Sequence, residues 1–470
     1  MIKVFGYPIA RFAVLLAGGE ACLFFLVILC CVLAPFSGHW LGLGRMSLTL
    51  PQAVSLAIFI VLVTSVMMAA TGLYHYEVMF DMGAVLARLA LSFSMAFAVT
   101  AGMAMLLSPW AIGYLPQYKI AVAVFPACAL LSFAVRGTFG RLALREDLKQ
   151  RVLVLGQGRN AAKIGEMESW QRYPFRILGT VDFGEKPDQQ VAQPSLSRLL
   201  TPAAALDLIE THGIDAVVIA DQAQVGLAQR ELQQCRRNGV KIEDFSTFWE
   251  RHAAHVDLDS LQTSFLIGSD SFSINRDHLI AKLCFDYIIA LLLLVTTAPI
   301  TILTAILIKA TSAGPIFFRQ DRVGRNGKIF QVLKFRSMTQ DAEQSGPQWA
   351  KAQDVRVTRV GRLIRMLRID EIPQVINLLK GEMSFVGPRP ERPFFVQQLI
   401  EQIPYFDERH RVKPGLSGWA QVNYPYGASV EDARHKLSYD LYYLKNGSMF
   451  LDLVILLRTV QVVLWPFGAR

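Results

Sequence analysis

The sequence predicts an α/β membrane protein with four N-terminal transmembrane helices, a soluble parallel-sheet domain, and a C-terminal α+β domain joined to a further membrane segment. Three observations support this architecture. Of the 470 residues 53% are hydrophobic, and the mean hydropathy of +0.34 is too high for an ordinary soluble protein of this length. Four apolar stretches of spanning length lie within the first 150 residues. Strand and turn patterns of a soluble α/β domain begin directly after them.

The first 150 residues are predicted to form a four-helix transmembrane region, because each apolar stretch is close to the ~20 residues that cross a bilayer. The stretches are residues 13–35, 53–74, 85–107 and 120–135. Basic residues gather before the first stretch and after the fourth, among them Lys3, Arg11, Arg136, Arg141 and Arg145. By the positive-inside rule, we expect both ends of this region on the cytoplasmic side.

The net charge of +9 fits either nucleic acid or an anionic membrane surface. Because the basic residues flank apolar segments, we expect the partner to be a lipid bilayer and not nucleic acid. The six cysteines show no CxxC spacing, which argues against a zinc or redox site. The first apolar stretch has no small-residue cleavage site before a polar region, so it is expected to stay as an anchor in a multi-pass protein.

Residues 151–266 are predicted to form a Rossmann-like domain. A hydrophobic strand at 151–155 runs into a GxGxxA turn at 156–161, and further strands are expected at 176–182 and 214–220. In a domain this short, the turn is compatible with a nucleotide site and equally with a structural or dimer-forming module. Both interpretations stay open.

A fifth apolar run, residues 279–308, has basic residues on both sides and is interrupted by Pro299. Proline removes a helical hydrogen bond and favours a sharp bend, and the similar charge on both sides gives no orientation preference. We therefore expect a re-entrant helix–break–helix, with the rest of the domain 275–470 on the cytoplasmic side. A final apolar helix at 451–464 carries charged residues such as Asp452 and is expected to lie on the membrane interface.

Asp370 and Glu371 are the candidate catalytic pair. Apolar residues at helical spacing follow them, Pro373 suits a first helical turn and Gly381 suits a helix end, so Asp370 is predicted at or near an N-cap. The helix dipole there would favour an ionised, nucleophilic carboxylate and a site for phosphate. Because adjacent carboxylates repel each other, Mg²⁺ bound between Glu371 and a pyrophosphate would be favourable. Taken alone, the pair also fits an ordinary helix cap followed by a first-turn acid.

A basic amphipathic helix precedes the pair. Its arginines recur every third residue opposite an apolar face, at Arg356, Arg359, Arg362, Arg365 and Arg368. Most are expected to contact lipid headgroups, whereas Arg365 and Arg368 are close enough in sequence to the pair to bind substrate phosphates. A solvated charged face would explain Arg356 and Arg359 equally well.

Two basic turns flank the candidate pair. After it, the segment Gly-Pro-Arg-Pro-Glu at 387–391 fixes the backbone around Arg389, which suits binding of a nucleotide by its guanidinium. Before it, two short strands are predicted around a basic, glycine-containing hairpin within residues 314–338. The basic residues that could bind a lipid-linked phosphate or lipid headgroups here are Arg319, Arg325, Lys334 and Arg336.

Together these residues resemble the bacterial sugar transferases, the polyprenyl-phosphate hexose-1-phosphate transferases that initiate exopolysaccharide, capsule and O-antigen synthesis. The motifs that carry the resemblance are Lys282 with Asp286, Gly314 to Gly324, Lys334 to Met338, Asp370 to Gln374, Gly387 to Glu391 and Lys413 to Gln421. The four spans and the Rossmann-like domain resemble the long form of the family, such as undecaprenyl-phosphate glucose or galactose phosphotransferases. Leu283 and Ala298 depart from the usual arginine and serine, which concerns only the membrane hairpin.

The resemblance implies a bacterial inner (cytoplasmic) membrane enzyme whose catalytic domain is cytoplasmic. It implies that Asp370 attacks the sugar-bearing phosphate of a UDP-sugar and releases UMP, and that undecaprenyl phosphate then attacks the sugar-phosphoryl aspartate. Glu371 would bind Mg²⁺, and the basic residues named above would bind the substrates. Glucose and galactose are the leading candidates for the sugar, and a homodimer is compatible with the resemblance.

Two other functions fit parts of the sequence. A membrane-bound nucleotide-sugar dehydratase or epimerase would explain spans followed by a dinucleotide-type turn, but the chain has no YxxxK pair, which such enzymes need. A non-enzymatic, lipid-binding scaffold would explain the arginine helix but not the Asp370–Glu371 pair and the Pro-Arg-Pro turn. Replacement of Asp370 by asparagine would separate the transferase from both.

Overall fold

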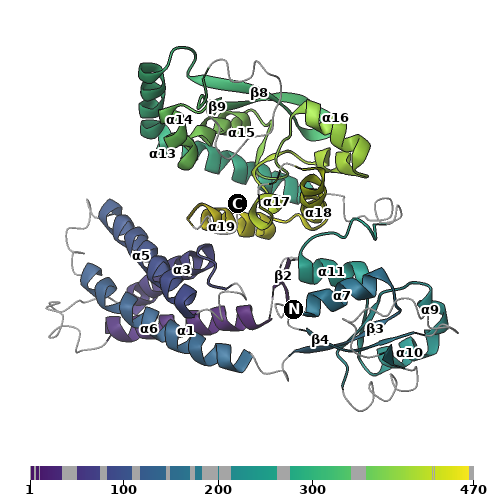
Figure 1. The fold of residues 1–470 in the computed structure, drawn as a ribbon. Helices are drawn as coiled ribbons and strands as arrows, with labels where there is room; N and C mark the ends of the chain where they lie inside the picture. The colour runs from purple at the N-terminus through teal and green to yellow at the C-terminus, as the bar shows by residue number, and fades with distance from the viewer. Residues whose placement is uncertain are drawn as a thin grey trace. The chain divides into compact units, whose positions relative to one another are not determined.

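Figure 1 shows the computed structural model of the chain. It describes residues 2–4, 7–9, 11–33, 50–74, 82–107, 117–143, 149–169, 175–182, 199–200, 213–261, 276–339, 356–425, 427 and 429–464. The chain divides into two compact units, whose main boundary lies between His252 and Ala253. The first unit contains a helical bundle and a parallel sheet, and the second contains a long apolar helix and a mixed α/β domain.

Four long helices form the N-terminal bundle, after the short strands β1 (Ile2–Val4) and β2 (Tyr7–Ile9). The helices are α1 (Arg11–Leu33), α3 (Leu50–Ala70), α5 (Met82–Leu107) and α6 (Gln117–Ala143). α3 contacts α1 and α5, and α6 contacts α5 and α1, so the four helices enclose a shared apolar core. In this core the ring of Phe93 lies edge to face with those of Phe24 and Phe125, at centroid distances of 5.8 Å and 6.0 Å.

Within the described part of the chain, four helices are long and apolar enough to cross a membrane. These spans are Val14–Cys31, Leu50–Ala70, Met82–Met103 and Leu279–Thr311. In α6, the predicted fourth span of the bundle, the apolar part whose side chains the structure describes is Val124–Thr138, which is shorter than the other spans. The helices support a multi-pass membrane protein.

A buried ion pair joins α1 and α6 inside the bundle. Arg136 donates from Nε to Oε1 of Glu20 at 2.8 Å and from Nη2 to Oε2 at 2.7 Å. Ser132 also donates to Glu20, and Nη1 of Arg136 donates to the carbonyl oxygen of Leu73, after α3, at 2.6 Å. Both charged side chains are at most 1% exposed. Since an unpaired charge is costly among apolar helices, this network fixes how α1, α6 and the end of α3 align.

A five-stranded parallel sheet follows the bundle in sequence. Its strands are β3 (Gln150–Leu155), β4 (Phe175–Val181), β5 (Leu199–Leu200), β6 (Ala216–Ile219) and β7 (Lys241–Asp244), in the spatial order β5-β4-β3-β6-β7. The helices around them are α7 (Arg159–Ser169), α9 (Gln224–Leu227), α10 (Gln229–Arg237) and α11 (Phe245–Ala253). Gly156 follows β3 with a φ of +95°, and a Cβ there would lie 2.6 Å from Cβ of Asp221 after β6. Only glycine permits this close approach.

Residues 253–261 pack with the second unit, although the sequence places them in the domain 151–266. Val256 is 3% exposed in the core of the second unit, and its N–H donates to the carbonyl oxygen of Ser438 at 3.1 Å. The indole N–H of Trp419 donates to the carbonyl oxygen of Ala254 at 2.7 Å. The boundary between the units therefore lies before this segment, while residues 262–266 lie outside the described part of the chain.

The fifth apolar run forms the helix α13 (Arg276–Thr311), which is 36 residues long. Its helical conformation continues through Pro299, so the expected interruption does not appear as a change of secondary structure. Thr296 and Thr297 donate their hydroxyls to carbonyl oxygens one turn earlier, at 2.8 Å and 2.6 Å. Such bonds are a known cause of helix bending, as is a proline within a helix.

Both ends of α13 contact the mixed α/β domain. Near the first end, Asp286 accepts the N–H of Phe385 at 3.1 Å. Near the other end, Ile308 is 2% exposed and packs with Phe335 and Ile364. Many side chains between these contacts are apolar and exposed, including Leu291, Leu292 and Ile302.

The mixed α/β domain follows α13 in sequence. Its strands are β8 (Phe317–Val323), β9 (Ile329–Phe335), β10 (Ser384–Val386) and β11 (Gly415–Ser417). Its helices are η4 (Arg325–Gly327), α14 (Arg359–Met366), η5 (Ile369–Gln374), α15 (Val375–Leu379), α16 (Pro393–Gln402), η6 (Phe406–Arg411), α17 (Trp419–Asn423), α18 (Val430–Asn446) and α19 (Met449–Leu464). The predicted hairpin is confirmed, because β8 and β9 pair antiparallel from Phe317 with Phe335 to Val323 with Ile329.

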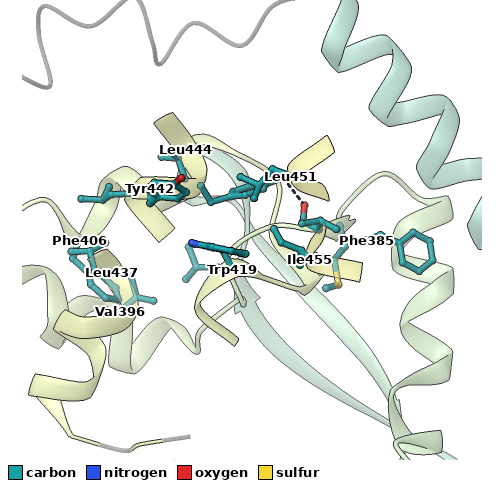
Figure 2. Packing of buried hydrophobic residues seen from close by; sticks show 14 of the residues in the cluster. Phe385, Val396, Phe406, Trp419, Leu437, Tyr442, Leu444, Leu451 and Ile455 are labelled. Carbon is teal, nitrogen blue, oxygen red and sulfur yellow. Dashed lines mark hydrogen bonds between the residues drawn. The ribbon is translucent and has the colours of Figure 1, made fainter. Parts of the chain in front are cut away.

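The core of this domain gathers around Trp419 (Figure 2). Trp419 is 1% exposed and stacks on Tyr442 of α18 at a centroid distance of 6.0 Å. α19 contributes Leu451 and Ile455, both fully buried. Asp452 of the same helix is 1% exposed and pairs with Lys282 of α13 at 2.6 Å. This carboxylate therefore faces inward and does not contribute to the polar face that was expected on a membrane-surface helix.

Candidate active site

The strand β9 brings Lys334 to the candidate pair, and Asn377 of α15 fixes this strand. The side-chain oxygen of Asn377 accepts the N–H of Leu333 at 3.1 Å, and its amide nitrogen donates to the carbonyl oxygen of Gln331 at 2.7 Å. Asn377 is 1% exposed, so its polar atoms must find partners within the protein. In the sequence the signal for this role is a polar residue between the apolar pairs Val375-Ile376 and Leu378-Leu379, and it was not among the predicted site residues.

The backbone around Asp370 differs from the predicted helix start. Arg368 has a φ of +57°, and the chain then forms the 3-10 helix η5 before α15 begins at Val375. Asp370 is the second residue of η5, and its side chain makes no capping hydrogen bond. Asp370 thus lies near a helix start, as predicted, but it is not the N-cap residue, and the helix is a 3-10 helix and not the expected α-helix. Because Pro373 lacks an N–H and lies in the middle of this turn, the regular α-helical bond pattern starts only after it.

Glu371 lies between two cationic side chains. Its Oε1 accepts a hydrogen bond from Nζ of Lys334 at 3.0 Å and another from Nη2 of Arg389 at 3.1 Å. Burial opposes ionisation of Glu371, but the charges of Arg389 and Lys334 outweigh it and lower the pKa of this carboxyl far below its usual range. Glu371 is therefore ionised at any physiological pH.

Asp370 has the opposite environment. It is 9% exposed, and Oδ1 is buried with no hydrogen-bond donor among the described residues. Burial, together with the neighbouring charge of Glu371, raises its pKa, while Lys334, Arg365 and Arg368 act against this rise. Among the described residues, these nearby cations are the groups that favour the ionised form of the Asp370 carboxyl. A carboxylate of raised pKa with a free oxygen is suited to nucleophilic attack.

The predicted basic helix is α14, which begins after the N-cap residue Thr358. Gly361 packs so closely on the preceding strand segment that a Cβ there would lie 1.9 Å from the carbonyl oxygen of Ser337. This contact fixes α14 beside β9. Arg365 and Arg368 are near enough to Asp370 to influence its pKa.

The outer surface of α14 is both basic and apolar. Its exposed side chains include Arg359 and Arg362, and the apolar Leu363, Met366 and Leu367 are 49%, 71% and 54% exposed. The predicted apolar face is thus divided, since Ile364 is buried against α13 whereas Leu363 and Leu367 face outward. Exposed leucines beside arginines are typical of a helix that contacts lipid.

Three predicted site residues do not contact the dyad. Arg336 is 7% exposed and donates from Nη2 to the carbonyl oxygen of Ser312 at 2.9 Å and to its hydroxyl at 2.6 Å, beside the end of α13. Arg325 lies in the tip of the hairpin, where its charge lowers the pKa of Lys413. Arg319 is exposed on β8. Of the predicted basic residues, the structure thus groups Lys334, Arg365, Arg368 and Arg389 around the dyad.

The carboxylates of Asp370 and Glu371 are the candidate ligands of the predicted Mg²⁺. Within the described ranges, no three His, Cys, Asp or Glu side chains gather as a metal site. Mg²⁺ often needs only one or two carboxylates, because substrate phosphates and water complete its coordination. Oδ1 of Asp370 accepts no hydrogen bond from the described residues, and the bonds from Lys334 and Arg389 both reach Oε1 of Glu371, which leaves Oε2 for a metal ion. The residues present therefore fit a Mg²⁺ ion that binds together with a phosphate-bearing substrate.

Comparison with known proteins identifies the family. Residues 277–466 match the family model described as "Bacterial sugar transferase". A UDP-N-acetylgalactosamine-undecaprenyl-phosphate N-acetylgalactosaminephosphotransferase of Aeromonas hydrophila is 42% identical over 258 residues, which are 54% of this chain and 60% of the relative. An undecaprenyl-phosphate glucose phosphotransferase of Komagataeibacter xylinus is 42% identical over 324 residues, 67% of this chain and 59% of the relative. The match thus spans less than two thirds of both relatives.

A third relative is matched over most of its length. This UDP-glucose:undecaprenyl-phosphate glucose-1-phosphate transferase of Klebsiella pneumoniae is 30% identical over 383 residues, which are 78% of this chain and 79% of the relative. The long match extends well beyond the region of the family model, so the relation is not limited to the C-terminal domain. The chain belongs to the bacterial sugar transferase family.

Proposed function

We propose that this protein transfers a sugar 1-phosphate from a UDP-sugar to undecaprenyl phosphate, with Asp370 as the nucleophile. Membership of the family and the activities for which the three relatives are named support the reaction class. The observation that carries the role of Asp370 is its buried carboxylate, whose Oδ1 has no hydrogen-bond donor among the described residues while cations surround it.

The reaction would proceed in two displacements at the same phosphorus atom. An oxygen of the Asp370 carboxylate forms a bond to the phosphorus that bears the sugar, and the bond from this phosphorus to the bridging oxygen of UMP breaks. An oxygen of undecaprenyl phosphate then bonds to the same phosphorus, and the aspartyl carboxylate leaves. The bond between sugar and phosphate never breaks, so the anomeric configuration is retained. A covalent intermediate allows the two anionic substrates to bind one after the other.

The residues around Asp370 would bind and orient the phosphates. Arg365 and Arg368 are the arginines that act on the charge of Asp370, so they are placed to attract a pyrophosphate to it. Lys334 and Arg389 hold Glu371 ionised and in position. Glu371 would then offer Oε2 to Mg²⁺, which when bound offsets the charge of the pyrophosphate. Removal of divalent ions with EDTA should abolish UMP release, and added Mg²⁺ should restore it.

The contacts of α13 support a re-entrant helix. Asp286 and Ile308, which contact the same domain, are 22 residues apart, and a straight helix would separate them by ~33 Å, the thickness of a bilayer core. A straight span would therefore carry them to opposite faces of the membrane. We infer that α13 bends near Pro299 and returns, which keeps the catalytic domain on the cytoplasmic side of the bacterial inner membrane with its UDP-sugar.

We further propose that the parallel sheet is a Rossmann-like domain. In chain order its strands are arranged 3-2-1-4-5, which is the Rossmann order without its sixth strand, and the GxGxxA turn follows the central strand β3. Nucleotide binding and dimer formation are the two roles that this domain could add. Titration of the purified protein with nucleotides and measurement of its mass in detergent would test them separately.

The decisive experiment replaces Asp370 by asparagine. We expect Asp370→Asn to abolish release of UMP from a UDP-sugar while membrane insertion stays normal, and we expect a labelled donor to leave a covalent adduct on the unmodified protein only. The matched control is Asp321→Asn, an exposed acid on the hairpin of the same domain. Full turnover by Asp370→Asn, or an adduct at another residue, would disprove the proposed nucleophile.

The donor would be a UDP-hexose. The relatives named above use glucose or N-acetylgalactosamine, and the sequence favoured glucose or galactose. Transfer of label from a panel of these UDP-sugars to undecaprenyl phosphate in membranes would identify the sugar. Transfer from none of them would contradict the proposed reaction.

A further inference from the structure

The turn that carries Arg389 is held by hydrogen bonds to four consecutive carbonyl oxygens. The carbonyl of Pro388 accepts the N–H of Gly415 in β11 at 2.9 Å, and that of Glu391 accepts the N–H of Val323 in β8 at 2.9 Å. The two carbonyls between them accept from arginine side chains. Arg389, the residue that contacts Glu371, therefore lies in a turn whose main chain is bound on every side.

Arg409 of η6 holds the carbonyl of Arg389 itself. Its Nη2 donates to this oxygen at 2.9 Å and also lies 2.9 Å from Oδ2 of Asp440 in α18. Arg409 is 6% exposed and Asp440 is 1% exposed, and the guanidinium also packs over the ring of Phe406. Burial raises the pKa of Asp440 to about 6, although Arg409 favours its ionised form, so at neutral pH the pair is charged.

Arg322 of β8 holds the next carbonyl in the same way. Its Nη1 donates to the oxygen of Pro390 at 2.9 Å and lies 3.5 Å from Oε2 of Glu391, and its Nη2 donates to Gln320 at 2.7 Å. Two arginines, each paired with a carboxylate, thus bind two consecutive carbonyl oxygens, those of Arg389 and Pro390.

Close packing at the start of the turn leaves little freedom for compensation. A Cβ on Gly387 would lie 2.4 Å from the carbonyl oxygen of Lys413, and a Cβ on Gly415 would lie 2.1 Å from the nitrogen of Gly387. The backbones of β10 and β11 therefore meet directly here. If an arginine contact is lost, the turn can relax only at Arg389 and Pro390, on the side of the active site.

We infer that Arg409 and Arg322 are positioning residues that fix the main chain of Arg389, so that its guanidinium meets Glu371 at 3.1 Å. The inference rests on the proposed function, since it assigns them a role through Arg389. A structural ion pair in the core would need only the carboxylate partners, whereas these guanidiniums also bind the carbonyls of the turn. Lysine would keep the charge, but its side chain is shorter and ends in a single rotating nitrogen, without the fixed planar fork of donors that a guanidinium has.

The test is a double-mutant cycle between Arg409→Lys and Arg389→Lys. We expect the Arg409→Lys variant to keep its fold and to have a kcat at least tenfold lower. In a protein that already carries Arg389→Lys, the same change should lower kcat less than threefold further. Such coupling is the signature of a residue that acts through another. Arg411→Lys is the matched control, because Arg411 belongs to the same 3-10 helix but is 51% exposed. It should leave kcat unchanged.

Additive losses in the two backgrounds, or full activity of Arg409→Lys, would overturn the inference. If Arg409→Lys does not fold, the same cycle with Arg322→Lys decides, with the same two outcomes. Failure of the proposed function is recognised separately, because Asp370→Asn would then keep its activity. If Asp370→Asn is inactive but the losses in the double-mutant cycle are additive, the role of Asp370 as nucleophile stands and only the positioning role of Arg409 and Arg322 is refuted.

Discussion

Replacement of Lys334 by methionine removes one of the two cations that hold Glu371. Lys334 donates to Oε1 at 3.0 Å and is 21% exposed, while Glu371 is 14% exposed. Methionine has a similar length and no charge, so it fills much of the same space. Arg389 keeps its bond of 3.1 Å to the same oxygen, which should preserve the fold of the site.

Two effects follow from this change. A hydrogen bond between charged groups contributes about 1.5–3 kcal/mol, and its loss in the transition state would lower kcat by about 10- to 150-fold. Among the cations that oppose the raised pKa of Asp370, Lys334 also has the largest effect. Without it this pKa rises further, a smaller fraction of Asp370 is ionised at a given pH, and the acidic limb of the rate profile moves to higher pH.

The measurement is UMP release from the UDP-sugar as a function of pH, normalised to the amount of protein in the membrane. Lys328→Met serves as the control, because Lys328 is an exposed residue in the same hairpin. We expect the control to keep the original profile. If Lys334→Met keeps both its kcat and its acidic limb, the electrostatic account of the dyad is wrong.

Three further changes test other parts of the structure. Arg136→Met leaves the carboxylate of Glu20 unpaired inside the bundle and should lower the stability of the detergent-solubilised protein by about 3–5 kcal/mol, seen as a lower Tm. Trp419→Ala empties the centre of the catalytic core and should cost about 3–5 kcal/mol, measured by thermal unfolding. Gly361→Ala places a methyl group against the carbonyl of Ser337, so α14 must shift, with a cost of about 1–3 kcal/mol and reduced UMP release.

Each of these predictions has its own control. Joint replacement of Arg136 and Glu20 by apolar residues should recover much of the lost stability, and a double variant as unstable as Arg136→Met would refute the account of the buried pair. Gly102→Ala changes a helical glycine with no atom within 4 Å and should be neutral. Unchanged Tm for Trp419→Ala, or unchanged turnover for Gly361→Ala, would contradict the packing described here.

Local patterns predicted a large part of the C-terminal domain. The hairpin of β8 and β9 was visible because alternating residues flank a glycine-containing turn, and the dyad stood out beside a stripe of arginines. The 3-10 conformation of η5 was not visible, because it depends on the left-handed backbone of Arg368, a residue with no intrinsic preference for it.

Contacts between distant segments could not be predicted. Arg409 and Asp440 are 31 positions apart (440 − 409), and neither belongs to a motif that signals their pairing. The inward position of Asp452 depends on Lys282, on a helix 170 residues earlier. The observed boundary between the units differs from the predicted one for the same reason, because Val256 is buried through its contact with α18. Sequence periodicity carries no information on such partners.

The segment 253–261 means that the borders of the matched family and those of the folding unit do not coincide. The family model starts at residue 277, yet the indole of Trp419 and the main chain of α18 are satisfied by Ala254 and Val256. A chain trimmed to the family region would lose the carbonyl oxygen that accepts the indole N–H of Trp419 and would uncover the apolar surface on which Val256 packs. Fragments of this protein that are meant to keep the catalytic domain intact should therefore be cut before residue 253.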